Sequence, residues 1–386
     1  MLALTAKSLI TPLEVIAEPI VLIDDGRIAD ITTRAARELP SSHTDLGDVL
    51  LAPGLLDVHI HGGISFDVMQ ATESELADFE RFLAEHGITS YLPTTVTAPE
   101  DQIERSLERL SRAVAGAAST GSRARPLGIH LEGPFISHAK RGVHPAECLR
   151  PADIQLFDRF YDAAAGALRM MTFAPELDNA DAFIRHAVSR GVTVSLGHSD
   201  ATYSQTHAGI SAGARTATHT FNAMRQLDHR EPGILGAVLT APSLMADIIA
   251  DGVHTHPDMI RLFLAAKGEE RAILITDALS ATGMPDGTYR LGPFDVDVKG
   301  DRCEHDGRLA GSVLTLDKAV RNVMRFAGWP LARALRLASH NPAQLLGLNN
   351  KGALSSGADA DLIALSPNGN VVRTIIAGQL CPTRRA

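Results

Sequence analysis

The stretch FIRHAVSRGVTVSLGHSD, residues 183–200, contains one complete unit of the fold that this sequence predicts. Its first half has the apolar spacing of a helix, Gly191 follows, and an apolar run then leads to polar residues. Glycine just past the last helical residue is a favoured helix C-cap, and a short apolar run rich in β-branched residues is typical of a buried strand. The stretch therefore predicts a helix that leads directly into a strand with His198 at its end.

The same unit recurs along the chain. In FERFLAEHGITSYLPTTV and GISAGARTATHTFNAM, Gly87 and Gly213 stand at the corresponding turn. The other candidate strands lie in LLDVHIH, PLGIHLEGPF, LRMMTFAPE, LMADIIADGVH and RAILITDALS, which makes eight in all. Helices that alternate with strands at this spacing indicate a parallel sheet, and eight such units indicate a closed (β/α)₈ TIM-type barrel. The expected fold class is therefore α/β.

The two chain ends have a different pattern. AEPIVLIDDGRIADI contains two short apolar segments around DDGR, which is a hairpin signal. Near the other end, GALSSGADADLIALSPNGNVVRTIIAGQ contains short strands separated by Gly, Asn and Pro. We expect residues 1–53 and 351–386 to form one small β domain, a β-sandwich built from both termini. Residues 54–350 are expected to form the catalytic barrel.

Composition narrows the range of partners. The chain has 386 residues and a net charge of −9, without any lysine-rich or arginine-rich run, so nucleic acid and anionic membrane surfaces are not expected to bind. Its three cysteines, Cys148, Cys303 and Cys381, are far apart and predict neither a disulfide framework nor a cysteine zinc site. With no signal-peptide pattern and no apolar run of about 18 residues, the expected location is the cytoplasm.

Most of the predicted strands end in a histidine or an acidic residue. These residues are His59 and His61 on the first strand, Glu132 on the third, His198 on the fifth, His219 on the sixth, His254 on the seventh and Asp277 on the eighth. In such barrels the carboxyl ends of the strands build the active site. Residues that are scattered in the sequence are therefore expected to converge at one mouth.

Two histidines and one carboxylate in this set have the chemistry of a catalytic zinc site with open positions for water. His198 and His219 are too far apart for one helix or hairpin and become neighbours only on adjacent barrel strands, with Glu132 on a third strand. The alternative is that each is an ordinary polar residue of the rim. His59 and His61 share one face of a strand, and we expect them to complete a second metal site bridged by Glu132, or else to hydrogen-bond the barrel floor.

Further residues are candidates for catalysis or substrate contact. Asp277 is expected to act as a general base beside the metal, although an N-cap role is the alternative. His130 is expected to be an interior histidine that supports a ligand. Four more features lie in the loops at the same mouth, namely Arg230 with a guanidinium suited to phosphate, His144 and His254, the amide of Asn222 with Ala223, and the small-residue turn RLAGS at 308–312.

Seven motifs occur together in one order. DVHIHGG, HLEGPF, GHSDAT, THTFNAM, REPG, IADGVH and ITDA follow one another along the chain. Together they resemble the N-acetylglucosamine-6-phosphate deacetylases of the amidohydrolase superfamily. The resemblance runs nearly from end to end and includes the split β domain. The His-x-His motif alone is shared across the superfamily, whereas the combination of the others is specific.

The resemblance implies a role for each matching residue. The metal ligands would be Glu132, His198 and His219, and the acid/base aspartate would be Asp277. The sugar and phosphate contacts would be Val143, His144, Asn222, Ala223, Arg230, His254, Leu309, Ala310 and Gly311. His59 and His61 would serve a second metal position, and one or two divalent metal ions, usually Zn²⁺, would bind per subunit. A metal lowers the pKa of bound water to about 7, and His144 would stabilise the oxyanion.

The resemblance implies hydrolysis of N-acetyl-D-glucosamine 6-phosphate to D-glucosamine 6-phosphate and acetate, by a homodimer or a higher homo-oligomer. Two alternatives remain. One is another amidohydrolase that acts on a cyclic amide or a different N-acetyl sugar. The other is a catalytically silent scaffold, which the filled ligand positions and Asp277 disfavour.

Overall fold

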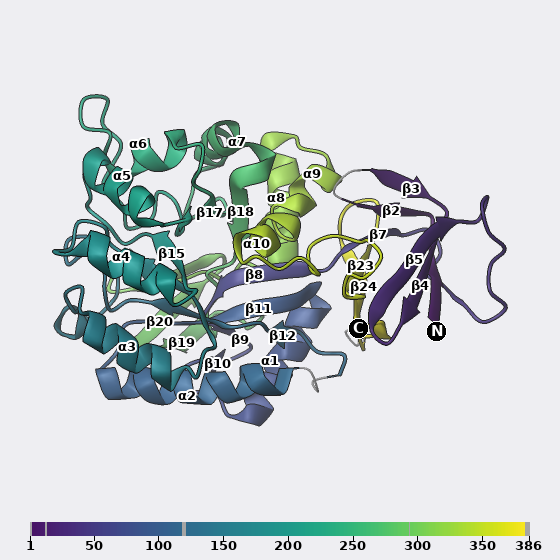
Figure 1. Ribbon diagram of the computed structural model, residues 1–386, viewed down its shortest axis with the longest axis horizontal. Helices are drawn as coiled ribbons and strands as arrows, with labels where there is room; N and C mark the ends of the chain where they lie inside the picture. The colour runs from purple at the N-terminus through teal and green to yellow at the C-terminus, as the bar shows by residue number, and fades with distance from the viewer. Residues whose placement is uncertain (1, 12–13, 118–120, 293, 383–386) are drawn as a thin grey trace.

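The computed structural model describes residues 2–11, 14–117, 121–292 and 294–382 (Figure 1). The eight predicted strands are present in the predicted order. They are β8 (Leu55–Ile60), β11 (Ile88–Thr95), β13 (Ile129–Glu132), β14 (Leu168–Phe173), β15 (Thr193–Leu196), β16 (Thr216–Ala217), β17 (Ala246–Ile249) and β18 (Ala272–Ile275). All the ladders among them are parallel, from β8 through β11 and onward to β16, and again between β17 and β18.

Individual hydrogen bonds complete the ring between these two groups of strands. Between β16 and β17, Met245 N donates to Arg215 O at 3.0 Å and Thr220 N donates to Asp247 O at 2.9 Å. Just past β18, Asp277 N donates to His59 O at 2.9 Å on β8. The last strand is thus joined to the first, and the predicted barrel is confirmed.

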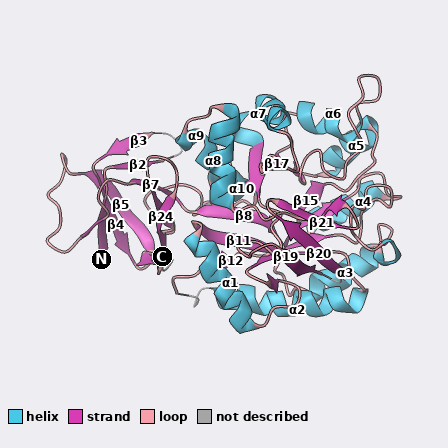
Figure 2. Ribbon diagram, turned by 180° about the vertical axis from the view of Figure 1, so that it is seen from behind, coloured by secondary structure: helices cyan, strands magenta, loops and turns pink. Residues whose placement is uncertain are grey.

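Helices surround the barrel (Figure 2). They are α1 (Glu73–Glu85), α2 (Glu100–Gly116), α3 (Ile154–Ala163), α4 (Ala180–Ser189), α5 (Tyr203–Ala212), α6 (Gly233–Thr240), α7 (Pro257–Arg271), α8 (Leu316–Ala327), α9 (Leu331–Arg336) and α10 (His340–Leu345). The predicted glycine turns follow α1, α4 and α5, where Gly87, Gly191 and Gly213 have φ of 80°, 80° and 123°. Because only glycine adopts these angles without strain, each one ends its helix and turns the chain into the next strand.

Two further sheets, the first from the N-terminal end alone and the second from both ends, lie beside the barrel at the right of Figure 1. One contains β1 (Leu2–Thr5), β4 (Pro19–Asp24), β5 (Arg27–Thr33) and β6 (Thr44–Asp45), with the expected hairpin around Asp25 and Gly26. The other contains β2 (Ser8–Ile10), β3 (Val15–Ala17), β7 (Leu50–Pro53), β23 (Leu362–Leu365), β24 (Val371–Ile376) and β25 (Gln379–Leu380). In it, Ala52 pairs with Ile363, so the two termini share one sheet. The boundaries of this β unit, residues 1–53 and 351–386, stay a prediction.

An antiparallel sheet follows β18 that the sequence analysis does not anticipate. It consists of β19 (Gly287–Leu291), β20 (Phe294–Lys299), β21 (Arg302–His305) and β22 (Arg308–Leu309). Its last turn returns to the barrel, where Ser312 N donates to Asp277 O at 2.7 Å. The insertion thereby brings residues 309–311 to the end of the eighth strand. Among the described residues, no helix is long and apolar enough to cross a membrane.

A buried carboxylate helps to hold the first and last strands together. Asp57 on β8 accepts a hydrogen bond from Thr276 Oγ1 at 2.6 Å, and its other oxygen accepts from His59 N at 3.2 Å and Thr276 N at 3.4 Å. Burial raises the pKa of Asp57 to about 6, although these donors act to lower it. The side chain is completely buried, so water cannot replace it.

Asp57→Ala is expected to lower the free energy of unfolding by about 3 kcal/mol or more, because it leaves buried donors on both strands unpaired. Urea denaturation measures this difference. Asp48→Ala is the control, because Asp48 is exposed in a surface ion pair with Lys7 and should cost no more than about 0.5 kcal/mol. Equal losses in the two variants would contradict a role for Asp57 in closing the barrel.

Candidate metal centre and active site

Two groups of three side chains meet at the carboxyl ends of the strands. Glu132, His198 and His219 form one group, and His59, His61 and Asp277 form the other. Within each group the ligand atoms lie within 4.8 Å of one another, and all six residues are buried. The structure therefore brings together the residues that the sequence placed on five separate strands.

Glu132 lies between the two groups. Its Oε1 is 3.3 Å from His198 Nε2 and 3.2 Å from His219 Nε2. The same carboxylate approaches the first strand, with Oε1 at 3.4 Å from His59 Nε2 and Oε2 at 3.3 Å from His61 Nε2. This position suits a carboxylate shared by two metal positions, and a second metal bridged by Glu132 stays a prediction.

Strained backbone aims three of these side chains. His198, His219 and Asp277 each stand two residues past the end of a strand, and their φ angles are 45°, 29° and 51°. Residues other than glycine rarely adopt positive φ, and such strain gathers at functional sites where the surrounding structure imposes it. The turn at each strand end directs the side chain across the mouth of the barrel.

Backbone carbonyls orient two of the imidazoles. His198 Nδ1 donates to Lys140 O at 2.9 Å, and His61 Nδ1 donates to Thr94 O at 3.0 Å. Because a carbonyl only accepts, each Nδ1 carries a proton, so the neutral form of each ring offers its Nε2 lone pair to the site. This is the arrangement found around histidines that bind metals.

The carboxylates in the site require positive charge nearby. Burial acts to lower the pKa of His61, but Asp277 and Glu132 outweigh it and raise this pKa to about 10. Burial likewise acts to raise the pKa of Asp277, but His61 and His59 lower it to about 2. A divalent cation supplies the same positive charge in place of protons. Imidazole nitrogens and carboxylate oxygens are ligands that zinc takes, so these residues fit such an ion.

His144 presents a hydrogen-bond donor to the site. Its Nδ1 accepts from Thr97 N at 3.3 Å and lies 2.7 Å from Thr97 Oγ1, so the proton of the neutral ring is on Nε2. This Nε2 lies 3.8 Å from Glu132 Oε2. Burial is the largest cause that lowers the pKa of His144, to about 3, so its ring is neutral near pH 7. Glycine is required at Gly133, because a Cβ there would lie 2.0 Å from Thr97 Oγ1.

One cavity of about 180 Å³ contains most of the predicted site. It is lined by His61, Val96, Glu132, Gly142, Val143, His144, His198, His219, Asn222, Ala223, His254, Asp277, Leu291, Leu309, Ala310 and Gly311. His59 is fully buried and is not one of the lining residues. Arg230 is exposed and is not part of the wall. The structure thus brings every predicted substrate residue except Arg230 to this cavity.

Several residues of the site were not identified from the sequence. Thr97 orients His144, and Thr94 orients His61. Asp251 orients His254, because Asp251 Oδ2 lies 2.6 Å from His254 Nδ1. The only sequence signals were the polar run PTTVT at the end of the second strand and the acid in IADGVH. His130 lies outside both ligand groups. Its Nδ1 donates to Val58 O at 3.0 Å, and its Nε2 lies 2.9 Å from Thr172 Oγ1.

Comparison with known proteins identifies the class. A model of the Amidohydrolase family matches residues 50–381. The chain therefore belongs to the amidohydrolase family, as the motifs predicted.

Individual relatives carry names that specify a substrate. N-acetylglucosamine-6-phosphate deacetylase of Bacillus subtilis (strain 168) is 37% identical and covers 97% of this chain, which covers 95% of that protein. N-acetylgalactosamine-6-phosphate deacetylase of Escherichia coli O157:H7 is 40% identical, and the match covers 92% of this chain and 93% of that protein. A mutant N-acetyl-D-glucosamine-6-phosphate deacetylase from Mycobacterium smegmatis, solved with N-acetyl-D-glucosamine-6-phosphate, has a TM-score of 0.92 and 36% identity, with 99% of each chain covered. The predicted resemblance to N-acetylglucosamine-6-phosphate deacetylases is confirmed.

Thr97→Val should change the tautomer ratio of the His144 imidazole, whereas Thr97→Ser should leave that ratio unchanged. Valine keeps the backbone N–H but removes the hydroxyl, and a hydrogen bond of about 1 kcal/mol corresponds to roughly a fivefold change in the ratio of the two tautomers. The ¹⁵N chemical shifts of the His144 ring nitrogens measure this ratio. The same tautomer ratio in the valine variant as in wild type would show that the hydroxyl does not orient His144.

Proposed function

We propose that this protein hydrolyses the acetamide of N-acetyl-D-glucosamine 6-phosphate to D-glucosamine 6-phosphate and acetate, in amino-sugar catabolism and cell-wall sugar recycling. The observation that carries the proposal is the single cavity toward which Glu132, Asp277, His144 and His198 converge from different strands and loops. Relatives that cover almost the whole chain and are named as deacetylases of hexosamine phosphates support the choice of substrate. A cytoplasmic location and assembly into a homodimer or a higher oligomer remain predictions.

The metal would be zinc. Glu132, His198 and His219 would hold one ion, and His59 and His61 would hold a second that shares Glu132. A bound divalent ion polarises a carbonyl oxygen and makes water acidic enough to lose a proton near neutral pH. The buried imidazoles that already have Nδ1 bonded to a carbonyl support this assignment.

Asp277 would accept the proton of the attacking water and deliver it to the departing amine. Despite burial, His61 and His59 lower the pKa of Asp277 to about 2, so its carboxylate is ionised near pH 7, as a proton acceptor must be. Its Oδ1 lies 3.1 Å from His61 Nε2, in the same cavity as Glu132. His144, whose Nε2 proton faces the cavity, would donate to the acetamide oxygen and stabilise the charge that develops there.

The sugar would lie against the remaining lining. Asn222 with Ala223, Val143 with His144, and His254 would contact its hydroxyl and phosphate groups, and the turn Leu309–Ala310–Gly311 would close over it. Arg230 is proposed to bind the phosphate from outside the cavity wall, which places the phosphate at the mouth. His254 is held for this contact by Asp251.

Acetate release from four sugars tests the proposal. Phosphorylated and unphosphorylated N-acetylglucosamine and N-acetylgalactosamine are compared by kcat/KM, with the highest value expected for N-acetylglucosamine 6-phosphate. The relative from Escherichia coli O157:H7 favours the galactosamine compound as the second candidate, and the ratio between the two phosphorylated sugars decides between them. No acetate from any of the four would refute the proposed activity.

His198→Ala or His219→Ala should remove the essential metal and nearly all activity. His59→Ala with His61→Ala should lower the metal content and cost less activity. Elemental analysis of the purified variants measures the metal, and His43→Ala, an exposed histidine of the β unit, is the control. If the double variant keeps the full metal content, the pair does not bind a second ion.

Asp277→Asn should keep the shape of the site but lose the base. General acid–base catalysis contributes about 10²–10⁴-fold, so kcat should fall by at least 100-fold while the substrate still binds. Steady-state kinetics and direct titration of substrate measure the two effects. Turnover near that of the wild type would assign the proton transfer to another group.

Arg230→Ala should lower kcat/KM for the phosphorylated sugar by about 10–150-fold, because a charge-assisted bond to phosphate contributes about 1.5–3 kcal/mol. Most of the loss should be in KM, since the contact is the same in the ground and transition states. Arg230→Lys should restore only part of the lost kcat/KM, because the ammonium of lysine does not reproduce the planar, two-donor geometry of the guanidinium. Equal losses for the unphosphorylated sugar would show that Arg230 supports its loop instead of binding phosphate.

A further inference from the structure

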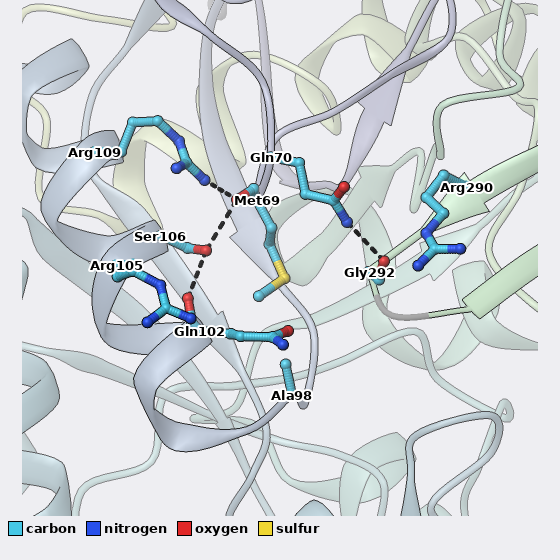
Figure 3. A pocket seen from close by; sticks show the side chains of 9 residues that line it. All are labelled: Met69, Gln70, Ala98, Gln102, Arg105, Ser106, Arg109, Arg290 and Gly292. Atoms are coloured by element: carbon cyan, nitrogen blue, oxygen red, sulfur yellow. Dashed lines mark hydrogen bonds between the residues drawn. The ribbon is translucent and has the colours of Figure 1, made fainter.

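A second hollow, which we call the arginine hollow, lies beside the catalytic cavity. It has a volume of about 560 Å³, within the range of small-molecule sites. It is lined by Met69, Gln70, Ala98, Gln102, Arg105, Ser106, Arg109, Arg290 and Gly292 (Figure 3). No residue is shared with the lining of the catalytic cavity, so the two hollows are separate.

The arginine hollow has an excess of positive charge. Arg105 and Arg109 project from α2, and Arg290 lies on the opposite side, on β19 (Figure 3). None of the nine lining residues is acidic. Arg105 pairs with Asp101 at 2.7 Å and Arg290 pairs with Asp295 at 3.0 Å, but each of these ion pairs is about half exposed or more. Exposed pairs contribute little, so both arginines can turn toward an anion at small cost.

The guanidinium of Arg109 has only part of its hydrogen-bonding capacity satisfied. Its Nη2 donates to Met69 O, but its Nε is buried and has no hydrogen-bond partner. Within the described ranges of the chain, Arg109 forms no ion pair. The nearby carboxylate of Asp67 already accepts from Met69 N and Gly292 N. Burial and the charge of Arg112 lower the pKa of Arg109, and the attraction of Asp67 offsets them only in part.

We propose that the arginine hollow binds a small phosphate-bearing anion. Three guanidinium groups surround a space large enough for a phosphate with a short organic group. Guanidinium forms paired, charge-assisted bonds with phosphate oxygens, and the amide of Gln102 on the same helix adds a neutral donor. The anion would place a negative charge beside the guanidinium of Arg109.

The arginine hollow and the catalytic cavity share a thin wall. On one segment, Val96 lines the catalytic cavity while its N–H donates to Met69 Sδ at 3.2 Å. On the other, Leu291 lines the catalytic cavity and the next residue, Gly292, accepts from Gln70 Nε2 at 2.8 Å. An anion in the arginine hollow would therefore stabilise the wall of the catalytic cavity.

The shared wall makes the two sites interdependent. If one ligand changes the affinity for the other, thermodynamic linkage requires the reverse effect to be equal. The meaning of this coupling for deacetylation rests on the proposed function, whereas binding in the arginine hollow does not.

Calorimetric titration of the full-length protein with inorganic phosphate and with glycerol 3-phosphate tests the site. The variant Arg105→Gln with Arg290→Gln changes two exposed side chains and keeps the contact of Arg109 with Met69. For each probe that wild type binds, the affinity of this double variant should be at least about tenfold weaker than that of wild type. Arg185→Gln, an exposed arginine on α4, is the matched control and should bind as wild type does.

Tighter binding of glycerol 3-phosphate than of inorganic phosphate would indicate that the ligand is a phosphomonoester, and the reverse order would indicate the free anion. Arg109→Gln, checked by thermal unfolding for a native fold, should lose binding as well. If the double variant binds both probes as tightly as wild type, the anion is held elsewhere, for example in the catalytic cavity, and the proposal is overturned.

Hydrogen exchange tests the shared wall without any turnover. Phosphate should slow amide exchange at residues 96–98 and 291–292 in wild type but not in the double variant, because the anion would hold both segments in place. Unchanged exchange in wild type at saturating phosphate would show that the wall does not respond. This result does not depend on the deacetylase activity, so it separates a failure of the coupling from a failure of the proposed function.

Discussion

The contact between the first and last barrel strands is the constraint on which the site depends. Asp57 on β8 and Thr276 after β18 are 219 residues apart in the sequence, yet they share a hydrogen bond of 2.6 Å in the core. Asp277, the residue after Thr276, donates its N–H to the carbonyl of His59, two residues after Asp57, so the backbone closure and the site are adjacent. Because the ring is closed, a histidine from the beginning of the barrel lies 3.1 Å from the carboxylate at its end.

Charge balance explains the composition of the centre. Glu132 and Asp277 are buried among imidazoles, and each has its pKa lowered by them despite burial. Such a cluster favours a cation, because removing carboxylates from water is costly unless positive charge accompanies them. The backbone carbonyls that bind the Nδ1 protons of His61 and His198 leave the Nε2 lone pairs for that cation. The proposed reaction uses the same charges, with Asp277 as an ionised base and His144 as a neutral donor.

The loops between the strands give the barrel its individual chemistry. The insertion formed by β19–β22 returns at Ser312 and places Leu309 and Gly311 over the end of the eighth strand. On the other side, Thr97 holds His144 and stands between Val96, which faces the catalytic cavity, and Ala98, which faces the arginine hollow. These two segments thus support a catalytic wall from one side and an anion site from the other.

The sequence by itself determined the barrel and the ligand types. Gly191 and its equivalents mark the helix ends, the apolar runs mark the strands, and each histidine or acid of the centre lies at or just beyond a strand end. Each of these features depends on residues that are close in the sequence, so the sequence predicts it without knowledge of the fold. The insertion after β18 was missed because its alternating pattern does not indicate which element it returns to.

Only the tertiary structure decided which partners meet. Thr97 bonds His144 across 47 residues, and Asp57 bonds Thr276 across 219. The exposed position of Arg230 and the separate arginine hollow also follow from how the loops pack. A single sequence gives the residue types but not the distances between distant segments, because those distances arise when the strands close into a ring and the loops pack over its mouth.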